Sequence, residues 1–151
     1  MSWKPDITVA AVIERERRFL IVEERISGKR VLNQPAGHVE SHESLLAAVV
    51  RETREETGWV FVPSALVGVY TWRKPGTLKD TLRFAIAGNV TAHDASVALD
   101  HPVIATHWLT REELQARASE LRTPLVLRCI DDYFSGSHGP LTAIADLRIP
   151  G

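Results

Sequence analysis

The chain has 151 residues, of which 44% are hydrophobic and 25% are charged, and this balance is typical of one globular domain over residues 1–151. The formal net charge of −1 argues against a general surface for a nucleic acid polymer. The single cysteine, Cys129, excludes an internal disulfide and suits a reducing compartment. No apolar run approaches 18 residues and the N-terminus lacks an apolar signal segment, so we expect a cytoplasmic protein without a membrane partner.

Three short strands are predicted in the first part of the chain. Apolar and β-branched residues favour strands over residues 7–13, 19–23 and 30–34. A loop at residues 34–38 should follow, because Pro35 fixes φ and Gly37 relaxes the backbone. Bare backbone of this kind can offer carbonyl oxygens to a hard cation. His38 is a candidate for substrate contact, with a solvated loop histidine as the alternative interpretation.

The most informative stretch, residues 37–59, combines a helical pattern with clustered carboxylates. Glu52, Glu55 and Glu56 span an arc of about 100° on a helix, beside an apolar arc that can pack on a sheet. Acids near a helix C-terminus oppose the helix dipole and repel one another. A shared divalent cation relieves this repulsion, so the pattern indicates a metal site.

Local signals also predict both ends of this helix. Gly58 suits the left-handed position that follows a helix. Ser41 or Ser44 can cap its start. Ala48 lies one turn before the acidic cluster, where a small side chain leaves room for ions and phosphate.

The same stretch resembles the signature of the Nudix hydrolases. The signature consists of a glycine, a glutamate, an Arg-Glu pair, a Glu-Glu pair and a closing glycine. In this sequence these positions are Gly37, Glu43, Arg51, Glu52, Glu55, Glu56 and Gly58. Thr53 and Trp59 depart from the usual aliphatic residues at positions that concern packing and not chemistry. The resemblance implies an α/β fold, an α/β/α sandwich with a central mixed β-sheet, and one to three Mg²⁺ ions as cofactor, with Mn²⁺ as an alternative.

The resemblance also implies roles for the residues of the signature. The expected metal ligands are the carbonyl of Gly37 and the carboxylates of Glu52, Glu55 and Glu56. Water is the expected nucleophile, and Glu52 is our first choice as general base, a role that differs among Nudix enzymes. Arg51 is expected to orient the carboxylates by pairing with Glu43 or Glu55, which makes Glu43 a structural brace.

The remaining strands are predicted from alternating and β-branched residues. Pro63 and Ser64 should separate the helix from them. The expected strands cover residues 65–73, 81–90 and 103–109, with a polar loop at 91–102. Several Nudix enzymes bring an extra carboxylate from such a loop to the metals, so Asp100, more than Asp94, is a candidate for a further ligand or base. Otherwise both acids are simply solvated.

Three side chains on these strands are candidates for substrate binding. Tyr70 and Trp72 share one face by the period of two. Such a pair is usually part of a core, but the strand ends in two basic residues, so stacking on a base is the alternative. Arg83 within the returning strand either lies on a wet face, pairs with an acid or binds a phosphate.

Two helices are predicted towards the C-terminus. Thr110 and Glu113 form a capping box at the start of the first. The second should run over about 125–134, with Thr123 as its cap and Pro124 in its first turn. Cys129 on this helix is expected in the core. The tail, residues 135–151, is expected to wrap loosely.

Further stretches, including residues 33–38, 82–84 and 121–126, resemble one bacterial subgroup of Nudix phosphatases. This implies hydrolysis of nucleoside tri- and diphosphates, or of thiamine pyrophosphate and its pyrimidine pyrophosphate precursor, often with release of one phosphate. Three alternatives stay open: another Nudix substrate (an ADP-sugar, a dinucleoside polyphosphate or an oxidised nucleotide), a non-catalytic nucleotide sensor, and an acidic helix in a structural domain. The sequence does not distinguish a monomer from a homodimer.

Overall fold

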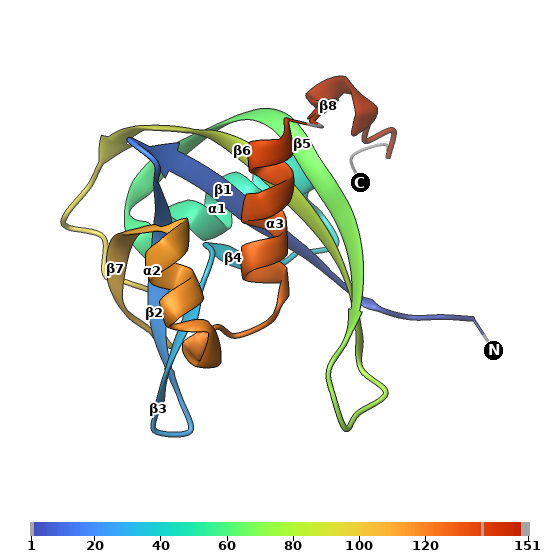
Figure 1. Ribbon diagram of the computed structural model, residues 1–151. Coiled ribbons are helices and arrows are strands. Elements are labelled where there is room, and N and C mark those ends of the chain that lie inside the picture. The colour runs from blue at the N-terminus through green and yellow to red at the C-terminus, as the bar shows by residue number, and fades with distance from the viewer. Residues whose placement is uncertain (1, 137, 149–151) are drawn as a thin grey trace.

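A mixed β-sheet forms the centre of the molecule (Figure 1). The computed structural model describes residues 2–136 and 138–148. The strands are β1 (Asp6–Arg15), β2 (Arg18–Ile26), β3 (Lys29–Asn33), β4 (Ala36–His38), β5 (Trp59–Arg73), β6 (Asp80–His93), β7 (Val103–Thr110) and β8 (Gly139–Pro140). The helices are α1 (Leu45–Thr57), α2 (Arg111–Ala116) and α3 (Leu125–Ser135), with 3₁₀ turns η1 (Ala118–Glu120) and η2 (Leu141–Ala143).

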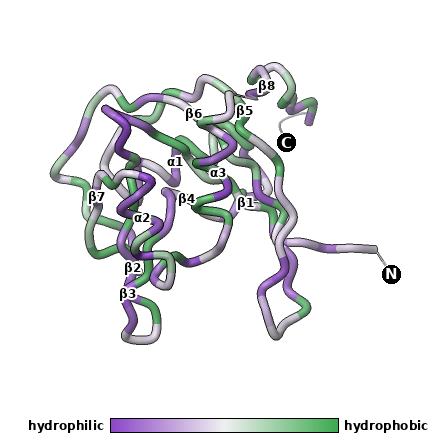
Figure 2. The backbone as a smooth tube through the Cα atoms, in the orientation of Figure 1, coloured by the Kyte–Doolittle hydropathy of each residue, from purple (hydrophilic) through white to green (hydrophobic). Residues whose placement is uncertain are grey.

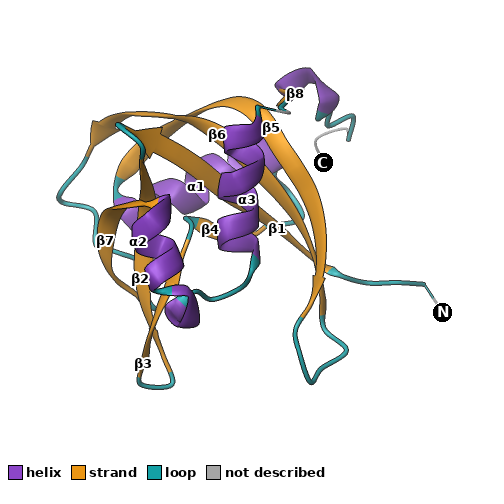
Figure 3. Cartoon of the chain, in the orientation of Figure 1, coloured by secondary structure: helices purple, strands orange, loops and turns teal. Residues whose placement is uncertain are grey.

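The sheet has helices on both faces, as Figure 3 shows. Its strand order is β3-β2-β1-β6-β5-β8, with β4 paired to β1 and β7 paired to β2. The β1–β6 pair is parallel, whereas the other pairs are antiparallel. One apolar cluster joins the sheet to α2 and α3, and a second joins it to α1. The predicted α/β/α sandwich around a central mixed sheet is confirmed.

The first strand shows why two layers of helices are needed. Both faces of β1 are buried from Thr8 to Ile13, so it carries a continuous apolar run instead of an alternating pattern. Figure 2 shows this run as a hydrophobic stretch passing between the helices. Val12 contributes to the cluster under α3, and Val9 to the cluster under α1.

The ends of α1 follow the local signals in the sequence. Ser44 is the N-cap, and its hydroxyl accepts a hydrogen bond from the Ala47 N–H at 3.1 Å. Gly58 ends the helix with φ of 76°, and its N–H donates to the Arg54 carbonyl at 2.8 Å. Ala48, Val49 and Thr53 lie on the buried face of the helix. The caps fix both ends of α1, and its apolar arc packs on the sheet, which leaves the acidic arc on another side of the helix.

Several strands run beyond their predicted bounds: β1, β2 and β6 are each longer than expected, and β6 takes in residues 91–93 of the predicted loop. The larger differences concern β4 and β5. Residues 36–38 form β4 and not a loop, because they pair with β1. β5 begins at Trp59 and continues through Pro63, where a break was predicted. The strand accommodates this proline at an irregularity in its pairing with β6, between Pro63 and Ala65.

The C-terminal helices agree with their predicted signals. The Thr110–Glu113 capping box is present at α2. At α3 the N-cap is Pro124, with helical backbone angles, and not the predicted Thr123, although the Thr123 hydroxyl accepts a hydrogen bond from the Leu125 N–H at 3.1 Å. Cys129 is buried in the core, as expected.

The tail does not wrap loosely, so that prediction was wrong for its described part. β8 pairs with β5, and Leu141 and Ile144 pack against the apolar cluster on the α1 side. Residues 137 and 149–151 of the predicted tail lie outside the described residues. Among the helices described, none is both long and apolar enough to span a bilayer.

Candidate active site

A cleft of about 740 Å³ opens at the edge of the sheet beside α1. The β2–β3 and β5–β6 hairpins, which project on the same side of the body in Figure 1, both contribute residues to its lining. Its acidic lining residues include Glu24, Glu52, Glu56 and Asp100, and its basic ones include Lys29, Arg30, Lys74, Lys79, Arg83 and Arg122. The cleft therefore combines carboxylates with cationic side chains in one solvent-accessible space.

Arg51 ties the carboxylates of α1 to the preceding loop. Its Nε and Nη2 donate to the two carboxylate oxygens of Glu43 at 2.9 and 2.6 Å. Its Nη1 donates to Glu52 at 3.0 Å and to Glu55 at 3.1 Å, so both partners expected for Arg51 are present. These hydrogen bonds from Arg51 hold the pKa of Glu43 below its usual value. Glu43 consequently stays ionised, and its bonds to Arg51 and to the Glu40 N–H suit the expected brace.

Gly37 lies directly against the Glu52 carboxylate. A Cβ at position 37 would collide with that carboxylate, so the glycine is required for a close approach and not for an unusual φ. Burial raises the pKa of Glu52, and repulsion from Glu55 and Asp100 adds to the effect, whereas Arg51 opposes it. Backbone and carboxylate oxygens thus converge at the wall of the cleft.

Glu56 is the most deeply buried acid of the helical cluster. Its side chain accepts a hydrogen bond from the Ala36 N–H at 2.7 Å, and the residue is 8% exposed. Burial raises its pKa to about 9, with repulsion from Glu52 and Glu24 in the same direction. Without a cation nearby this carboxyl is therefore protonated at neutral pH.

Comparison with known proteins identifies the chemistry that this helix serves. The family model for the NUDIX domain matches residues 4–129. The chain belongs to the Nudix family. It is 39% identical to the phosphatase NudJ of Shigella boydii and to that of Escherichia coli K12, in each case over 98% of this chain and 95% of the relative. A solved Nudix hydrolase from Nitrosomonas europaea superposes with a TM-score of 0.92 at 42% identity, covering 95% of this chain and 97% of the other.

These findings make the chain a hydrolase that acts on phosphoanhydrides in small molecules. Nudix hydrolases generally depend on divalent metals, and the oxygen donors here suit such an ion. Glu52, Glu56 and the Gly37 backbone approach one another at the cleft, and the deeply buried Glu56 carboxyl has one hydrogen-bond donor among the described residues, the Ala36 N–H.

The carboxylates are not arranged as a finished metal cage. Over residues 2–136 and 138–148 no three acidic, histidine or cysteine side chains are grouped closely enough to hold an ion. Glu55 is turned to Arg51 and its side chain is 43% exposed, and it is absent from the lining of the cleft. The Nudix helix therefore presents two acids at the cleft, while the third is held by the arginine.

Arg83 occupies the base of the cleft. It is 7% exposed, and its Nε donates to the Thr8 hydroxyl at 3.4 Å. Its Nη1 is buried without a hydrogen-bond partner among the described residues, and no carboxylate lies within ion-pair distance there. Burial consequently lowers the pKa of Arg83. The sequence left three interpretations of Arg83 open. For the described chain, a solvent-exposed position and a pairing with an acid are both excluded.

The structure separates the two aromatic candidates. Tyr70 and Trp72 share the face under α3, as the period of two predicts. Tyr70 is buried in the core, and its hydroxyl donates to Asp132 at 2.7 Å. Trp72 lies nearer the strand end and lines the cleft. Tyr70 thus has the position of a packing residue, and only Trp72 is placed where substrate could touch it.

Two loop residues also reach the cleft. His38 lines it with a largely exposed ring, 3.6 Å from Asp6. Asp100 lines it close enough to Glu52 to raise the pKa of that acid. The Asp100 N–H donates to the Glu55 carbonyl at 3.0 Å, which anchors the loop to α1. Asp94 lies outside the cleft lining, beside Arg54.

The Glu24–Arg122 pair at the cleft was not predicted from the sequence. Arg122 Nη1 donates to Glu24 at 2.8 Å, and the other carboxylate oxygen of Glu24 is buried without a partner in the described chain. Glu24 belongs to the charged stretch Glu23–Arg25, which follows the apolar residues 19–22 of β2, and this interruption of the apolar run was the available signal. Arg122 had no such signal, because it precedes α3 in a short polar connection.

Proposed function

We propose that this chain hydrolyses a phosphoanhydride bond of a nucleoside di- or triphosphate, or of a thiamine or pyrimidine pyrophosphate, with Mg²⁺ as the cofactor. The observation that carries the proposal is the meeting of Glu52, Glu56 and the Gly37 backbone at the same cleft as Arg83, whose buried Nη1 has no hydrogen-bond partner among the described residues. Likeness to the NudJ phosphatases supports release of orthophosphate. We keep a single domain over residues 1–151, a monomer or homodimer, and a cytoplasmic location as predictions.

The hard oxygen donors favour Mg²⁺, with Mn²⁺ as a substitute. Glu52, Glu56 and the Gly37 carbonyl are the proposed ligands at the cleft, and Glu55 is a further ligand once it leaves Arg51. When bound, divalent ions neutralise phosphate charge and lower the pKa of coordinated water.

The protein groups then have distinct tasks. Glu52 is our first choice to accept the proton of the attacking water, because it lies at the cleft and the hydrogen bond from Arg51 favours its ionised form. Arg51 orients the carboxylates of Glu52 and Glu55 by hydrogen bonding. Arg83 is proposed to bind a phosphate oxygen, since a guanidinium without a carboxylate partner favours an anion. Asp100 is proposed as a further ligand or base.

The outer cleft is proposed to hold the remainder of the substrate. Trp72 offers a ring for stacking at one side, and His38 can contact substrate at the other. The proposed metal ligands and Arg83 recognise only the diphosphate. The group attached to the diphosphate, which would lie in the outer cleft, therefore distinguishes one Nudix substrate from another. An ADP-sugar, a dinucleoside polyphosphate and an oxidised nucleotide remain the alternatives.

The test is a panel of nucleoside phosphates, thiamine pyrophosphate and these alternatives, with separate detection of phosphate and pyrophosphate. We expect turnover that requires Mg²⁺, and we expect Glu56→Gln to lower kcat at least ~10²-fold with the circular dichroism spectrum retained. Glu112→Gln, a change of the same kind at an exposed position of α2, is the matched control. If Glu56→Gln turns over substrate as fast as the control, Glu56 is not a metal ligand. If the wild type hydrolyses only another diphosphate of the panel, the proposed substrate class is wrong.

A further inference from the structure

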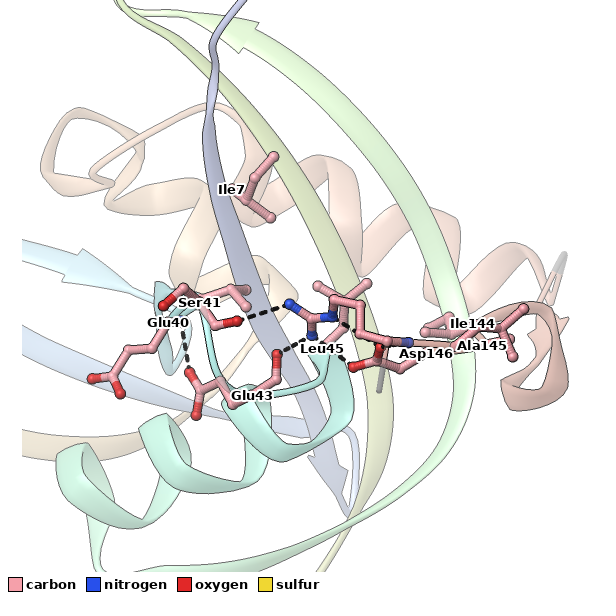
Figure 4. Close-up of a pocket in the computed structure, with 11 residues that line it drawn as sticks. Ile7, Glu40, Ser41, Glu43, Leu45, Ile144, Ala145 and Asp146 are labelled. Carbon is pink, nitrogen blue, oxygen red and sulfur yellow. Dashed lines mark hydrogen bonds and ion pairs between the residues drawn. The ribbon is translucent and has the colours of Figure 1, made fainter. Parts of the chain in front are cut away.

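The C-terminal segment, residues 141–148, runs past the start of α1. Leu141 and Ile144 anchor it to the apolar cluster beneath that helix. A hollow of about 660 Å³ lies between the segment and the loop that precedes α1 (Figure 4). Ser41 and Glu43 of this loop face the segment across the hollow. Residues 144–148 are thereby brought beside the residues that lead into the Nudix helix.

Arg148 spans the hollow and binds the backbone of this loop. Its Nη1 donates to the Ser41 carbonyl at 2.9 Å, and its Nη2 donates to the Glu43 carbonyl at 2.6 Å. Asp146 fixes the guanidinium from the other side, accepting from Nε at 2.9 Å and from Nη2 at 2.6 Å. A planar guanidinium held in this bidentate pair fixes the direction of its remaining donors.

Glu43 connects this contact to the catalytic helix. Its carbonyl accepts from Arg148, and its carboxylate accepts two hydrogen bonds from Arg51. Arg51 in turn contacts Glu52 and Glu55. Glu43 is 9% exposed, so its backbone and side chain have little freedom to move independently. A displacement of the loop backbone would therefore change the position of Arg51.

We propose that Arg148 is a positioning residue for the catalytic carboxylates: by holding the Ser41 and Glu43 carbonyls, it fixes Glu43 and, through Glu43, Arg51. This inference rests on the proposed function of the Nudix helix. Arg148 touches neither the cleft nor its carboxylates, so its effect passes through Glu43. The described tail is thus part of the scaffold that supports the site.

The test compares Arg148→Ala and Arg148→Lys with Arg111→Ala. Arg111 forms a bidentate pair with Asp131, far from the carboxylate network, and is the matched control. Supporting contacts around metal ligands typically change affinity or activity about 10- to 100-fold, so we expect Arg148→Ala to lower kcat about 10-fold with KM nearly unchanged. Affinity of the substrate-free protein for Mn²⁺, measured by electron paramagnetic resonance, should weaken at least ~3-fold. Lysine should restore part of both losses.

A double-mutant cycle with Glu43→Gln tests the route of the effect. If Arg148 acts through Glu43, the change to alanine costs much less in the Glu43→Gln background than in the wild type. Additive losses, or Arg148→Ala with the kcat and Mn²⁺ affinity of the Arg111→Ala control, would overturn the proposal. Absence of wild-type turnover would refute only the proposed function, because the Mn²⁺ affinities still measure positioning.

Discussion

Glu56→Gln should stabilise the metal-free protein at neutral and alkaline pH while it lowers metal-dependent activity. The buried carboxyl has its pKa raised from 4.5 to about 9, chiefly by burial. Between these values the folded chain keeps a proton that the unfolded chain has lost. Stability therefore falls as pH rises through this window, by up to about 1.4 kcal/mol for each pH unit.

The size of the effect follows from the same shift. At pH 7.5 the carboxyl is three units above its ordinary pKa, which corresponds to about 4 kcal/mol in a rigid, dry site. Relaxation and entry of water reduce the expected cost to about 2 kcal/mol. Glutamine has no charge to lose, and its side-chain oxygen can still accept the Ala36 N–H. The variant should therefore melt about 4–8 °C above the wild type at pH 7.5.

Thermal unfolding in EDTA between pH 4.5 and 9 measures this difference. The two proteins should converge at the acid end, where both side chains are neutral, and diverge as pH rises. Added Mg²⁺ should raise the Tm of the wild type and leave that of the variant unchanged, because binding to the folded state stabilises it. A pH-independent difference, or a variant less stable than wild type at pH 7.5, would refute the account of Glu56.

Three other substitutions test separate parts of the site. Gly37→Ala should lower kcat ~10²-fold in a phosphate-release assay, because the new Cβ displaces the Glu52 carboxylate; full activity would contradict that close approach. Arg83→Ala should raise KM at least ~10-fold with a smaller change in kcat, and an unchanged KM would make the arginine structural. Gly58→Ala should cost about 1–2 kcal/mol in urea unfolding, since φ is 76° and the Asp94 carbonyl lies 2.8 Å from the added Cβ; equal stability would refute the cap.

The features predicted correctly are those set by neighbours in the chain. Caps at Ser44, Gly58 and Thr110 depend on one hydroxyl or one backbone angle, and each is present. The acidic arc of α1 follows from helical geometry alone. The strands β4 and the start of β5 were missed because their pairing comes from partners distant in sequence, and such pairing can carry a strand through Pro63.

The sequence also could not predict how deeply each residue of a strand is buried. The period of two correctly placed Tyr70 and Trp72 on one face, yet it gives no measure of how far α3 extends over that face. Asp132 of α3 covers Tyr70, whereas Trp72 remains at the cleft. The tail was misjudged for a related reason: its polar and glycine-containing sequence conceals two apolar anchors, Leu141 and Ile144, whose burial depends on a cluster formed by α1 and the sheet.

Arg51 explains how the chain can fold with its acids together before an ion binds. Four of its hydrogen bonds go to carboxylates, two to Glu43 and one each to Glu52 and Glu55. The bidentate pair with Glu43 is the more buried and has the stronger geometry, so it is the part that stays fixed. The single bonds to Glu52 and Glu55 can be exchanged for metal coordination at less cost. Arg51 thus serves as an internal counter-ion, which lowers the repulsion among the acids in the metal-free fold. It leaves Glu52 and Glu55 available to a cation.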